Sequence, residues 1–229
     1  MTTYCITGAS RGIGFGLTEK LTARGDRVIA GVRDPNAPAL AKLAKDRPGL
    51  ITAHRCDVSD DASVAAFARA LGGKPIDVLI NNAGIRGPKP QNALDVDLAA
   101  FAEVLATNTL APLRVARALL PNLRAAPKAR IITVSSIMGQ LSRSGPGDVA
   151  YCTSKTAVNK VMQTLAAELQ ADGIMVAMVH PGWVKTDMGG AIAPLSVDQS
   201  TTGLVATIDR LTFDNTGGFF NYDGKPLAW

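Results

Sequence analysis

The chain contains few of the residues that bind metals. Its 229 residues include three cysteines and two histidines; the histidines are widely separated, and no Cys-x-x-Cys pair occurs. A structural zinc site needs four such ligands, so we predict no metal site. The cysteines, Cys5, Cys56 and Cys152, are odd in number and lie in apparent strand or helix context, which is typical of reduced thiols in a cytoplasmic protein.

Long apolar runs are also missing. No window approaches the roughly 18 uninterrupted apolar residues that a membrane-spanning helix requires. The first residues, Met1 to Gly8, show no basic segment followed by a long apolar one, so no secretory signal is visible. With 47% hydrophobic and 19% charged residues, the composition predicts a globular cytoplasmic protein with a sizeable core and no membrane partner.

The basic residues are not gathered into a block. The net charge is +5 and the pI is about 9.3, but lysines and arginines are dispersed along the chain and are not interleaved with aromatics. A nucleic-acid surface needs such a basic patch, so we predict no nucleic-acid partner. A modest positive excess also suits a protein that binds a small nucleotide anion.

Apolar strands alternate with amphipathic segments from one end of the chain to the other. We expect strands at 3–7, 27–32, 50–56, 76–80, 130–135, 174–180 and 219–222. We expect helices at 13–23, 63–71, 97–107, 111–123, 150–171 and 201–211, and a further one that Asp34-Pro35-Asn36 opens, with Pro38 near its first turn. This alternation predicts an α/β fold with helices on both faces of a parallel sheet.

No linker, repeat or low-complexity tract divides the chain, so residues 1–229 read as a single domain. We predict a doubly wound, parallel, seven-stranded sheet of the Rossmann type, with strand order 3-2-1-4-5-6-7. In such sheets the ligand binds beyond the carboxyl ends of the strands, where the strand order reverses. The informative residues should therefore directly follow strands.

A glycine-rich turn, Thr7-Gly8-Ala9-Ser10-Arg11-Gly12-Ile13-Gly14, follows the first expected strand and leads into a helix. Glycines there permit a tight turn and close approach of the backbone to a pyrophosphate, and a helix N-terminus offers free N–H groups to phosphates. The spacing Gly-x-x-x-Gly-x-Gly departs from the usual Gly-x-Gly-x-x-Gly. Its position still predicts a dinucleotide site that includes Gly8, Ser10, Arg11, Gly12, Ile13 and Gly14.

The end of the second expected strand indicates which dinucleotide binds. An acidic residue about 20 positions beyond the glycines would bind a ribose 2′-OH and mark NAD. Asp34 is near that distance, but Val32 ends the strand and Arg33 follows it. Arg33 and Arg11 could both contact a 2′-phosphate, so we predict NADP(H) and consider NAD(H) the weaker alternative. These residues could also have no role in cofactor binding: both arginines would then be solvated surface charges, and Asp34 would help to start the next helix.

Two further turns follow expected strands. Asp57-Val58 comes after the third, where a carboxylate could accept a hydrogen bond from the adenine amino group. Asn81-Asn82-Ala83-Gly84 comes after the fourth. The small residues Ala83 and Gly84 permit close approach to a cofactor, and the Asn81 amide could tie neighbouring strand ends together. A plain turn would explain the second motif equally well.

The candidate acid–base group is Tyr151-Cys152-Thr153-Ser154-Lys155. On a helix, positions i and i+4 share a face, so the Lys155 ammonium would lie near the Tyr151 phenol. A nearby cation favours the phenolate and lowers its pKa from about 10, which would make the phenol an acid or base near neutral pH. Taken alone, this spacing is also a common coincidence on helices.

Residues near other breaks in the pattern could assist this pair. Ser136 leaves the fifth expected strand and could donate a hydrogen bond to a carbonyl oxygen; no histidine or acid pattern beside it suggests a nucleophile. Asn108 lies between two helical stretches, shortly before Pro112, where its amide could anchor a relay water. Ordinary capping would explain either residue singly.

A rigid turn, His180-Pro181-Gly182-Trp183-Val184-Lys185-Thr186, follows the sixth expected strand. The backbone at Pro181, Gly182 and Val184, together with the Thr186 hydroxyl, could fix a nicotinamide carboxamide. His180 precedes a proline at the end of a strand, and we interpret it as structural.

These motifs occur in the order found in the short-chain dehydrogenase/reductase family, which the chain resembles over essentially its whole length. The tail, from His180-Pro181-Gly182 to Phe219–Gly224, looks like the C-factor and sniffer-type carbonyl reductase branch. The resemblance implies that Tyr151 exchanges a proton with the carbonyl oxygen and that Lys155 lowers its pKa and binds the nicotinamide ribose. It also implies that Ser136 polarises the carbonyl, and that Asn108 holds the relay water.

One spacing departs from the family. Ser136 and Tyr151 are 15 positions apart, about two more than the resemblance implies, and the additional length falls in 140–148. Ser135 therefore stays open as an alternative to Ser136. Candidate walls of the substrate site are 86–91, 137–148, Trp183 and 188–195, within which we expect contacts from Ile137, Met138, Trp183 and Met188.

The apolar character of these walls favours a bulky, largely apolar ketone or aldehyde. The sequence thus predicts an NADPH-dependent carbonyl reductase or alcohol dehydrogenase, with cofactor binding mainly in 1–108 and catalysis and substrate binding mainly in 108–229. The alternative is an NADP-sensing or signalling protein of the C-factor type with little turnover. The partner is a small carbonyl or alcohol substrate, and the oligomeric state stays open between monomer, dimer and tetramer.

Overall fold

A single parallel sheet carries the fold in this computed structural model, which describes residues 1–143 and 145–229. Within these residues the sheet has the order β3-β2-β1-β4-β5-β6-β7, and neighbouring strands pair in parallel. The predicted fold class and strand order are confirmed. The strands are β1 (Thr3–Thr7), β2 (Arg27–Val32), β3 (Ile51–Arg55), β4 (Val78–Asn81), β5 (Arg130–Val134), β6 (Met175–His180) and β7 (Phe219–Asn221).

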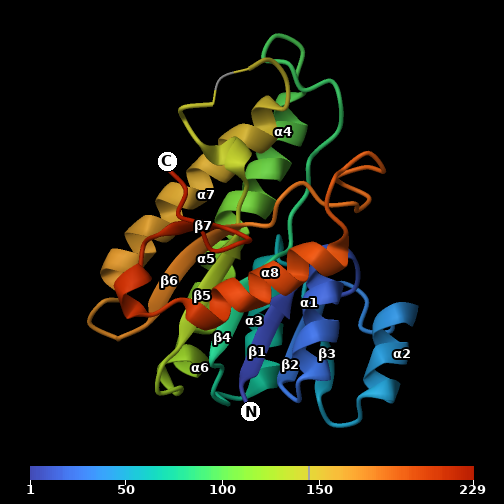
Figure 1. Ribbon diagram of the computed structural model, residues 1–229, viewed down its shortest axis with the longest axis vertical. Coiled ribbons are helices and arrows are strands. Elements are labelled where there is room, and N and C mark those ends of the chain that lie inside the picture. Colours follow the sequence, from blue (N-terminus) through green and yellow to red (C-terminus); the bar gives the residue numbers. More distant parts are fainter. Residues whose placement is uncertain (144) are drawn as a thin grey trace.

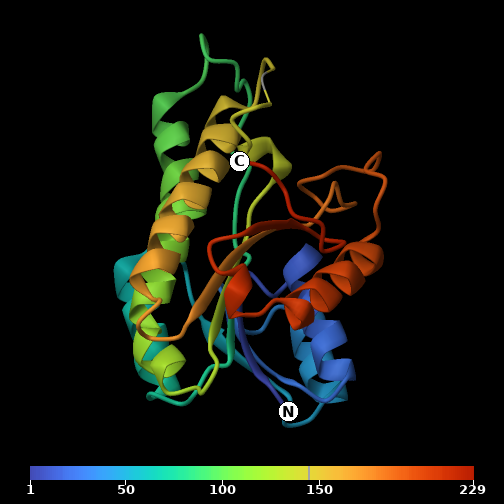
Figure 2. The same cartoon turned by 60° about the vertical axis from the view of Figure 1, so that its left-hand side comes forward.

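Helices cover both faces of the sheet (Figures 1 and 2). One face carries α1 (Gly12–Ala23), α2 (Pro38–Asp46) and α8 (Val197–Arg210). The other carries α3 (Asp61–Leu71), α4 (Leu98–Leu105), α5 (Ala111–Ala118), α6 (Leu120–Arg124) and α7 (Val149–Glu168). The short 3-10 helices η2 (Ile137–Gly139) and η3 (Phe213–Asn215) lie in the connections after β5 and α8.

The core is split into two layers by the alternation of side chains along the strands. Leu79 and Ile131 pack on the side of α3, α5 and α7, whereas Ile80 and Ile132 pack on the side of α1 and α8. All four are fully buried, and each such side chain contributes about 1.5–3 kcal/mol by leaving water. Both faces of the central strands are therefore apolar, as a sheet covered by helices requires.

The predicted break near Asn108 takes the form of a wide helical turn, η1 (Ala106–Leu110), between α4 and α5. The Ala111 N–H reaches the Ala106 carbonyl five residues earlier. Pro112 has no N–H and so cannot donate to the carbonyl of Asn108 four residues before it, which favours this π-type turn. The insertion turns the Asn108 side chain toward the interior, where it is 1% exposed.

Two helix boundaries differ from prediction for reasons visible in the sequence. Helix α8 begins at Val197 rather than at 201, because Ser196 and Gln199 form a reciprocal capping box. The expected helix 111–123 is divided into α5 and α6 at Leu119, directly before a second proline, Pro121, enters the first turn of α6. None of the helices in the described part of the chain is both long and apolar enough to cross a membrane.

Helix α1 packs closely on the end of β1 because position 14 has no side chain. A Cβ at Gly14 would overlap the Gly8 carbonyl oxygen and would come within 2.5 Å of Asn82 Nδ2. The first of these groups belongs to the backbone of the glycine-rich turn, so it cannot move without deforming that turn. Gly14 thus fixes the position of the α1 N-terminus relative to the sheet edge.

We predict that Gly14→Ala lowers the free energy of unfolding by about 1–3 kcal/mol, the usual effect of overpacking. Urea unfolding should show a lower midpoint with an unchanged slope. Gly145→Ala is the matched control, because a Cβ there meets no atom within 4 Å. Equal midpoints for the two variants would contradict the packing role of Gly14.

Candidate active site

The predicted site residues meet at the carboxyl edge of the sheet. β1 lies between β2 and β4, so the strand order reverses beside the glycine-rich turn, where doubly wound sheets bind their ligands. The segments that follow β1, β4, β5 and β6 all reach this edge, and α7 places its first turns beside them. They carry the glycine-rich turn, the Asn81–Gly84 turn, Ser135 and Ser136, the 181–196 segment, and the Tyr151–Lys155 pair.

Tyr151 and Lys155 share one face of α7, as predicted. Lys155 Nζ lies 5.7 Å from the centroid of the Tyr151 ring and donates a hydrogen bond to the Val134 carbonyl at 2.9 Å. Lys155 is only 6% exposed, and no carboxylate in residues 1–143 or 145–229 forms an ion pair with it. Burial without a counter-ion lowers the pKa of Lys155 to about 8.

The phenol of Tyr151 behaves differently from the expectation drawn from its spacing to Lys155. Burial raises the pKa of Tyr151, and the nearby Ser136 hydroxyl and the charge of Arg86 oppose that rise only in part. The predicted lowering by Lys155 is therefore wrong for this structure, because desolvation of the phenolate outweighs the nearby positive charges. Tyr151 is consequently a protonated phenol at neutral pH.

The two consecutive serines after β5 point to different neighbours. Ser136 lies close enough to the Tyr151 phenol to lower its pKa, and it accepts a hydrogen bond from the Met138 N–H at 3.1 Å. Ser135 donates to Asn159 Oδ1 at 2.6 Å and is 1% exposed against α7. Ser136 is thus the hydroxyl beside the phenol, whereas Ser135 fastens β5 to the helix.

Asn108 braces three segments together. Its Oδ1 accepts from the Ile85 N–H at 2.8 Å, and its Nδ2 donates to the Ile85 carbonyl at 2.7 Å and to Ser154 Oγ at 3.0 Å. Both amide hydrogens are therefore used within the protein, which leaves one lone pair of Oδ1 for a water molecule. Sequence reasoning missed Ser154, whose position three residues after Tyr151 on the same helix face was the available signal.

The link between the ends of β1 and β4 comes from Asn82 rather than from Asn81. Asn82 Nδ2 donates to the carbonyls of Thr7 at 2.9 Å and Gly8 at 3.2 Å. Asn81 instead donates to the Pro112 carbonyl at 3.3 Å, on the side of α5. The sequence-based assignment to Asn81 was wrong because Asn81 is the last residue of β4 and its side chain points out of the sheet toward α5, whereas Asn82 lies beyond the strand, where its amide reaches the backbone that ends β1.

The glycine-rich turn leaves its helix N-terminus open to an anion. Gly8 and Gly12 have φ values of 68° and 55°, which glycine adopts without strain. The N-cap residue of α1 is Arg11, whose side chain has no acceptor for the first N–H groups of the helix. These N–H groups and the helix dipole suit a phosphate, so the turn fits the dinucleotide predicted for it.

Basic side chains gather beyond β2 and β3. Arg33 and Arg55 both lie near the Asp57 carboxylate, and Arg55 pairs in register with Val32 at the end of β2. Asp57 accepts hydrogen bonds from Ser59 N and Oγ at 3.0 and 2.7 Å, and these, with the two arginines, lower its pKa. Arg55 was missed from the sequence, although it closes a strand at the edge where ligands bind.

The segment after β6 folds back toward the glycine-rich turn. Val184 forms a bridge with Leu195, and a Cβ at Gly12 would lie 3.5 Å from Thr186 Cγ2. Arg11 forms an ion pair with Asp187 at 2.6 Å, with both side chains well exposed. This segment therefore borders the cofactor side of the site with Pro181, Gly182, Val184 and Thr186 as predicted neighbours.

The expected substrate contacts lie on the open side of the site. Trp183 and Met188 are 51% and 40% exposed, whereas Ile137 and Met138 in η2 are partly buried. The expected wall 137–148 includes Ser144, which lies outside the described residues. His180 is mostly buried, and burial together with the charge of Arg143 lowers its pKa to about 4, so it is neutral at pH 7, in keeping with a structural role.

Known proteins resemble this chain in both sequence and structure. The short chain dehydrogenase family model matches residues 2–194. The C-signal of Myxococcus xanthus is 41% identical over 165 residues, which cover 72% of this chain and 99% of that protein. An NADPH-bound carbonyl reductase from chicken fatty liver superimposes with a TM-score of 0.92 at 33% identity, covering 100% of this chain and 99% of that one.

The carbonyl reductase Sniffer of D. melanogaster gives a TM-score of 0.92 at 36% identity and covers 100% of both chains. The family match spans most of the chain, and the two solved structures share its whole fold. The chain belongs to the short-chain dehydrogenase family.

Proposed function

We propose that the protein is an NADPH-dependent carbonyl reductase, also able to act as an alcohol dehydrogenase, on a bulky and largely apolar ketone or aldehyde. The observation that carries this proposal is the meeting of Ser136, Tyr151 and Lys155 beside a turn that fits a dinucleotide. The likeness to an NADPH-bound carbonyl reductase supports the cofactor and the reaction class.

The residues that would hold the cofactor surround the strand-order reversal. The α1 N-terminus with Gly8, Ser10, Gly12 and Ile13 would bind the pyrophosphate, and Arg11 and Arg33 the 2′-phosphate. Asp57 and Val58 would contact the adenine, and Asn81, Ala83 and Gly84 would line the path to the nicotinamide. Lys155 would bind the ribose, and the carboxamide would rest on Pro181, Gly182, Val184 and Thr186. When bound, NADPH supplies the hydride.

The chain itself supplies the proton. Ser136 would donate a hydrogen bond to the substrate carbonyl oxygen and would stabilise the negative charge that develops there during reduction. The Tyr151 phenol, protonated because burial raises its pKa, then gives its proton to the oxygen. Lys155 offers a positive charge beside the phenolate that remains, and Asn108 holds the segment through which a relay water would return a proton.

A signalling role is the second candidate, because the C-signal is 41% identical to this chain. The complete set of Ser136, Tyr151 and Lys155 favours the enzyme, since a protein that only senses NADP has no need of a buried acid–base pair.

The free thiols of Cys5, Cys56 and Cys152 support a cytoplasmic location. Within the single domain, residues 1–108 would mainly bind the cofactor, and residues 108–229 would mainly carry out catalysis.

We expect Tyr151→Phe to lower kcat by about 10²–10⁴, the usual effect of losing a general acid, and to change the NADPH dissociation constant by less than about threefold, because the phenol acts mainly in the transition state. The assay follows NADPH absorbance with a panel of aromatic ketones and aldehydes. Tyr4→Phe, which removes a phenol oxygen near the amino end of β1, is the control and should retain activity.

A large loss of NADPH binding in Tyr151→Phe would show that the residue is structural. Wild-type protein that binds NADPH tightly but reduces no carbonyl of the panel would favour the signalling role instead.

Arg33→Ala should weaken NADPH binding far more than NADH binding. Loss of a charge-assisted hydrogen bond to the 2′-phosphate corresponds to about 1.5–3 kcal/mol, or roughly 10- to 100-fold in the dissociation constant. Titration calorimetry with both cofactors measures the difference. Arg27→Ala, at the opposite end of β2, serves as the control and should affect neither; an equal effect of Arg33→Ala on both cofactors would contradict the assignment.

A further inference from the structure

The catalytic helix α7 begins in an unusual way. Its N-cap residue, Asp148, has φ 52° and ψ 31° and makes no side-chain capping bond. An N-cap aspartate ordinarily has extended backbone and accepts hydrogen bonds from the next N–H groups, whereas Asp148 adopts the left-handed conformation that aspartate and asparagine visit only occasionally. Its carboxylate is therefore turned away from the helix N–H groups and can bind a partner outside the helix.

The Asp148 carboxylate is bound by Arg86, 62 positions earlier in the loop between β4 and α4. Arg86 Nε and Nη2 donate to Oδ1 and Oδ2 at 3.0 and 2.6 Å. The pair is bidentate and partly buried, with the two side chains 39% and 18% exposed. Such a fork-to-carboxylate geometry is stronger and more directional than an ordinary surface pair.

Because the Asp148 side chain does not cap α7, the first N–H groups of the helix bind Gln91, in the same loop as Arg86. The backbone carbonyl of Gln91 accepts from the Val149 N–H at 3.0 Å, and Gln91 Oε1 accepts from the Tyr151 N–H at 3.3 Å. Gln91 Nε2 in turn donates to the Arg86 carbonyl at 2.6 Å. Loop 86–91 is therefore bonded to the first turn of α7 at Asp148, Val149 and Tyr151 itself.

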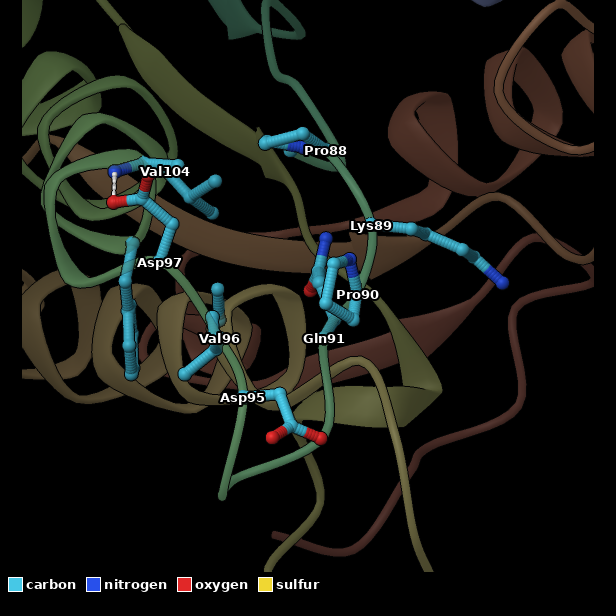
Figure 3. A pocket seen from close by; sticks show the side chains of 12 residues that line it. Pro88, Lys89, Pro90, Gln91, Asp95, Val96, Asp97 and Val104 are labelled. Carbon is cyan, nitrogen blue, oxygen red and sulfur yellow. Dashed lines mark hydrogen bonds between the residues drawn. The ribbon is translucent and has the colours of Figure 1, made fainter.

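The loop is closely seated on the helices below it. A Cβ at Gly87, where φ is 85°, would come within 2.6 Å of Val104 Cγ2. A small cavity of about 50 Å³ remains between the loop, α4 and Ala150 of α7. Figure 3 shows Gln91 and Val104 on opposite sides of this cavity. Loop 86–91 thus has little room to shift without moving the start of α7.

We propose that Arg86 is a positioning residue for Tyr151: through its ion pair with Asp148, it joins loop 86–91 to the catalytic helix and holds the phenol against Ser136. The inference rests on the proposed function for its catalytic meaning, but its geometry is independent of any substrate. Loop 86–91 also borders the expected substrate site, so the ion pair connects a substrate-facing segment with the proton donor.

The two partners also act on the phenol with opposite charges. Arg86 lowers the pKa of Tyr151, whereas Asp148 raises it. The other groups near the phenol are Ser136 after β5 and Cys152 and Lys155 on α7, and Lys89 lies near Asp148. Removal of either partner breaks the same ion pair but changes the charge beside Tyr151 in the opposite sense.

This opposition gives a direct test in the cofactor-free protein. Tyrosine labelled with ¹³C at Cζ reports the titration of the three tyrosines, Tyr4, Tyr151 and Tyr222, and Tyr151→Phe assigns the Tyr151 signal. We expect Arg86→Met to raise the pKa of Tyr151 by about half a pH unit or more and Asp148→Asn to lower it by a similar amount. Asparagine is chosen because it tolerates the left-handed conformation.

Steady-state kinetics provides the second readout. Arg86→Met should lower kcat about tenfold or more with little change in KM for NADPH, and Arg86→Lys, which keeps the charge but loses the fork, should restore part of the loss. The matched control is Arg124→Met. Arg124 forms a bidentate pair with Asp172 at 3.0 and 2.9 Å, just beyond the far end of α7, about 30 Å along the helix, and its variant should leave Tyr151 and kcat unchanged.

Shifts of the same sign in Arg86→Met and Asp148→Asn, or no shift in either, would show that the ion pair does not lie beside the phenol and would overturn the proposal. Asp148→Asn compared with wild type keeps this readout even where Arg86→Met does not fold. A wild-type kcat in Arg86→Met would overturn the positioning role itself, because opposite charges near a phenol shift its pKa in opposite senses whether or not they position it. If the phenol shifts diverge as expected while wild-type protein reduces no carbonyl, the placement of the ion pair beside the phenol stands and the proposed function fails.

Discussion

The structure around the site depends on a buried ammonium group that has no counter-ion. Lys155 is bonded to a backbone carbonyl, that of Val134, and no carboxylate of the described chain forms an ion pair with it. A buried charge without a counter-ion lowers the stability of the fold unless a bound ligand pairs with it or accepts its hydrogen bonds. Gly84 approaches this group closely: a Cβ there would lie 3.7 Å from Lys155 Nζ and 3.1 Å from Asn108 Oδ1. The protein therefore keeps a cation poised at the carboxyl edge of the sheet, beside a protonated phenol.

Long-range hydrogen bonds between loops and helices hold this arrangement in place without any ligand. Asn82 fastens the turn after β4 to the end of β1, and Asn108 fastens the next residues of that loop to α7 through Ser154. Gln91 then caps the first turn of the helix. The connection from β4 to α4 thus contacts the glycine-rich turn and the first turn of α7, which carries Tyr151, in succession. Such preorganisation lets the groups that stabilise developing charge act without rearrangement during the reaction.

Much of this could be predicted from the sequence because it rests on local patterns. The parallel α/β sheet followed from the alternation of elements, and its strand order from the resemblance to the family. The break at Asn108 followed from Pro112, and the shared face of Tyr151 and Lys155 from helical spacing. What could not be predicted depends on which way a side chain points or on a distant partner. Asn82 rather than Asn81 faces β1, and the balance of burial over charge at Tyr151 requires the fold. The pairing of Arg86 with Asp148 crosses 62 positions and leaves no local signature.

The claim that Lys155 is a buried, uncompensated cation is tested most directly by the pH dependence of stability in wild type and Lys155→Met. Folding lowers the pKa of Lys155 from 10.5 to about 8. Between these two pH values the unfolded chain binds more protons than the folded one, so the free energy of unfolding of the wild type rises with pH. The stability advantage of Lys155→Met over wild type should therefore be constant below pH 8 and shrink by about 3 kcal/mol as the pH rises through this window. Chemical unfolding at closely spaced pH values measures it. Parallel stability curves for the two proteins would show that the ammonium has an ordinary pKa and would contradict the account.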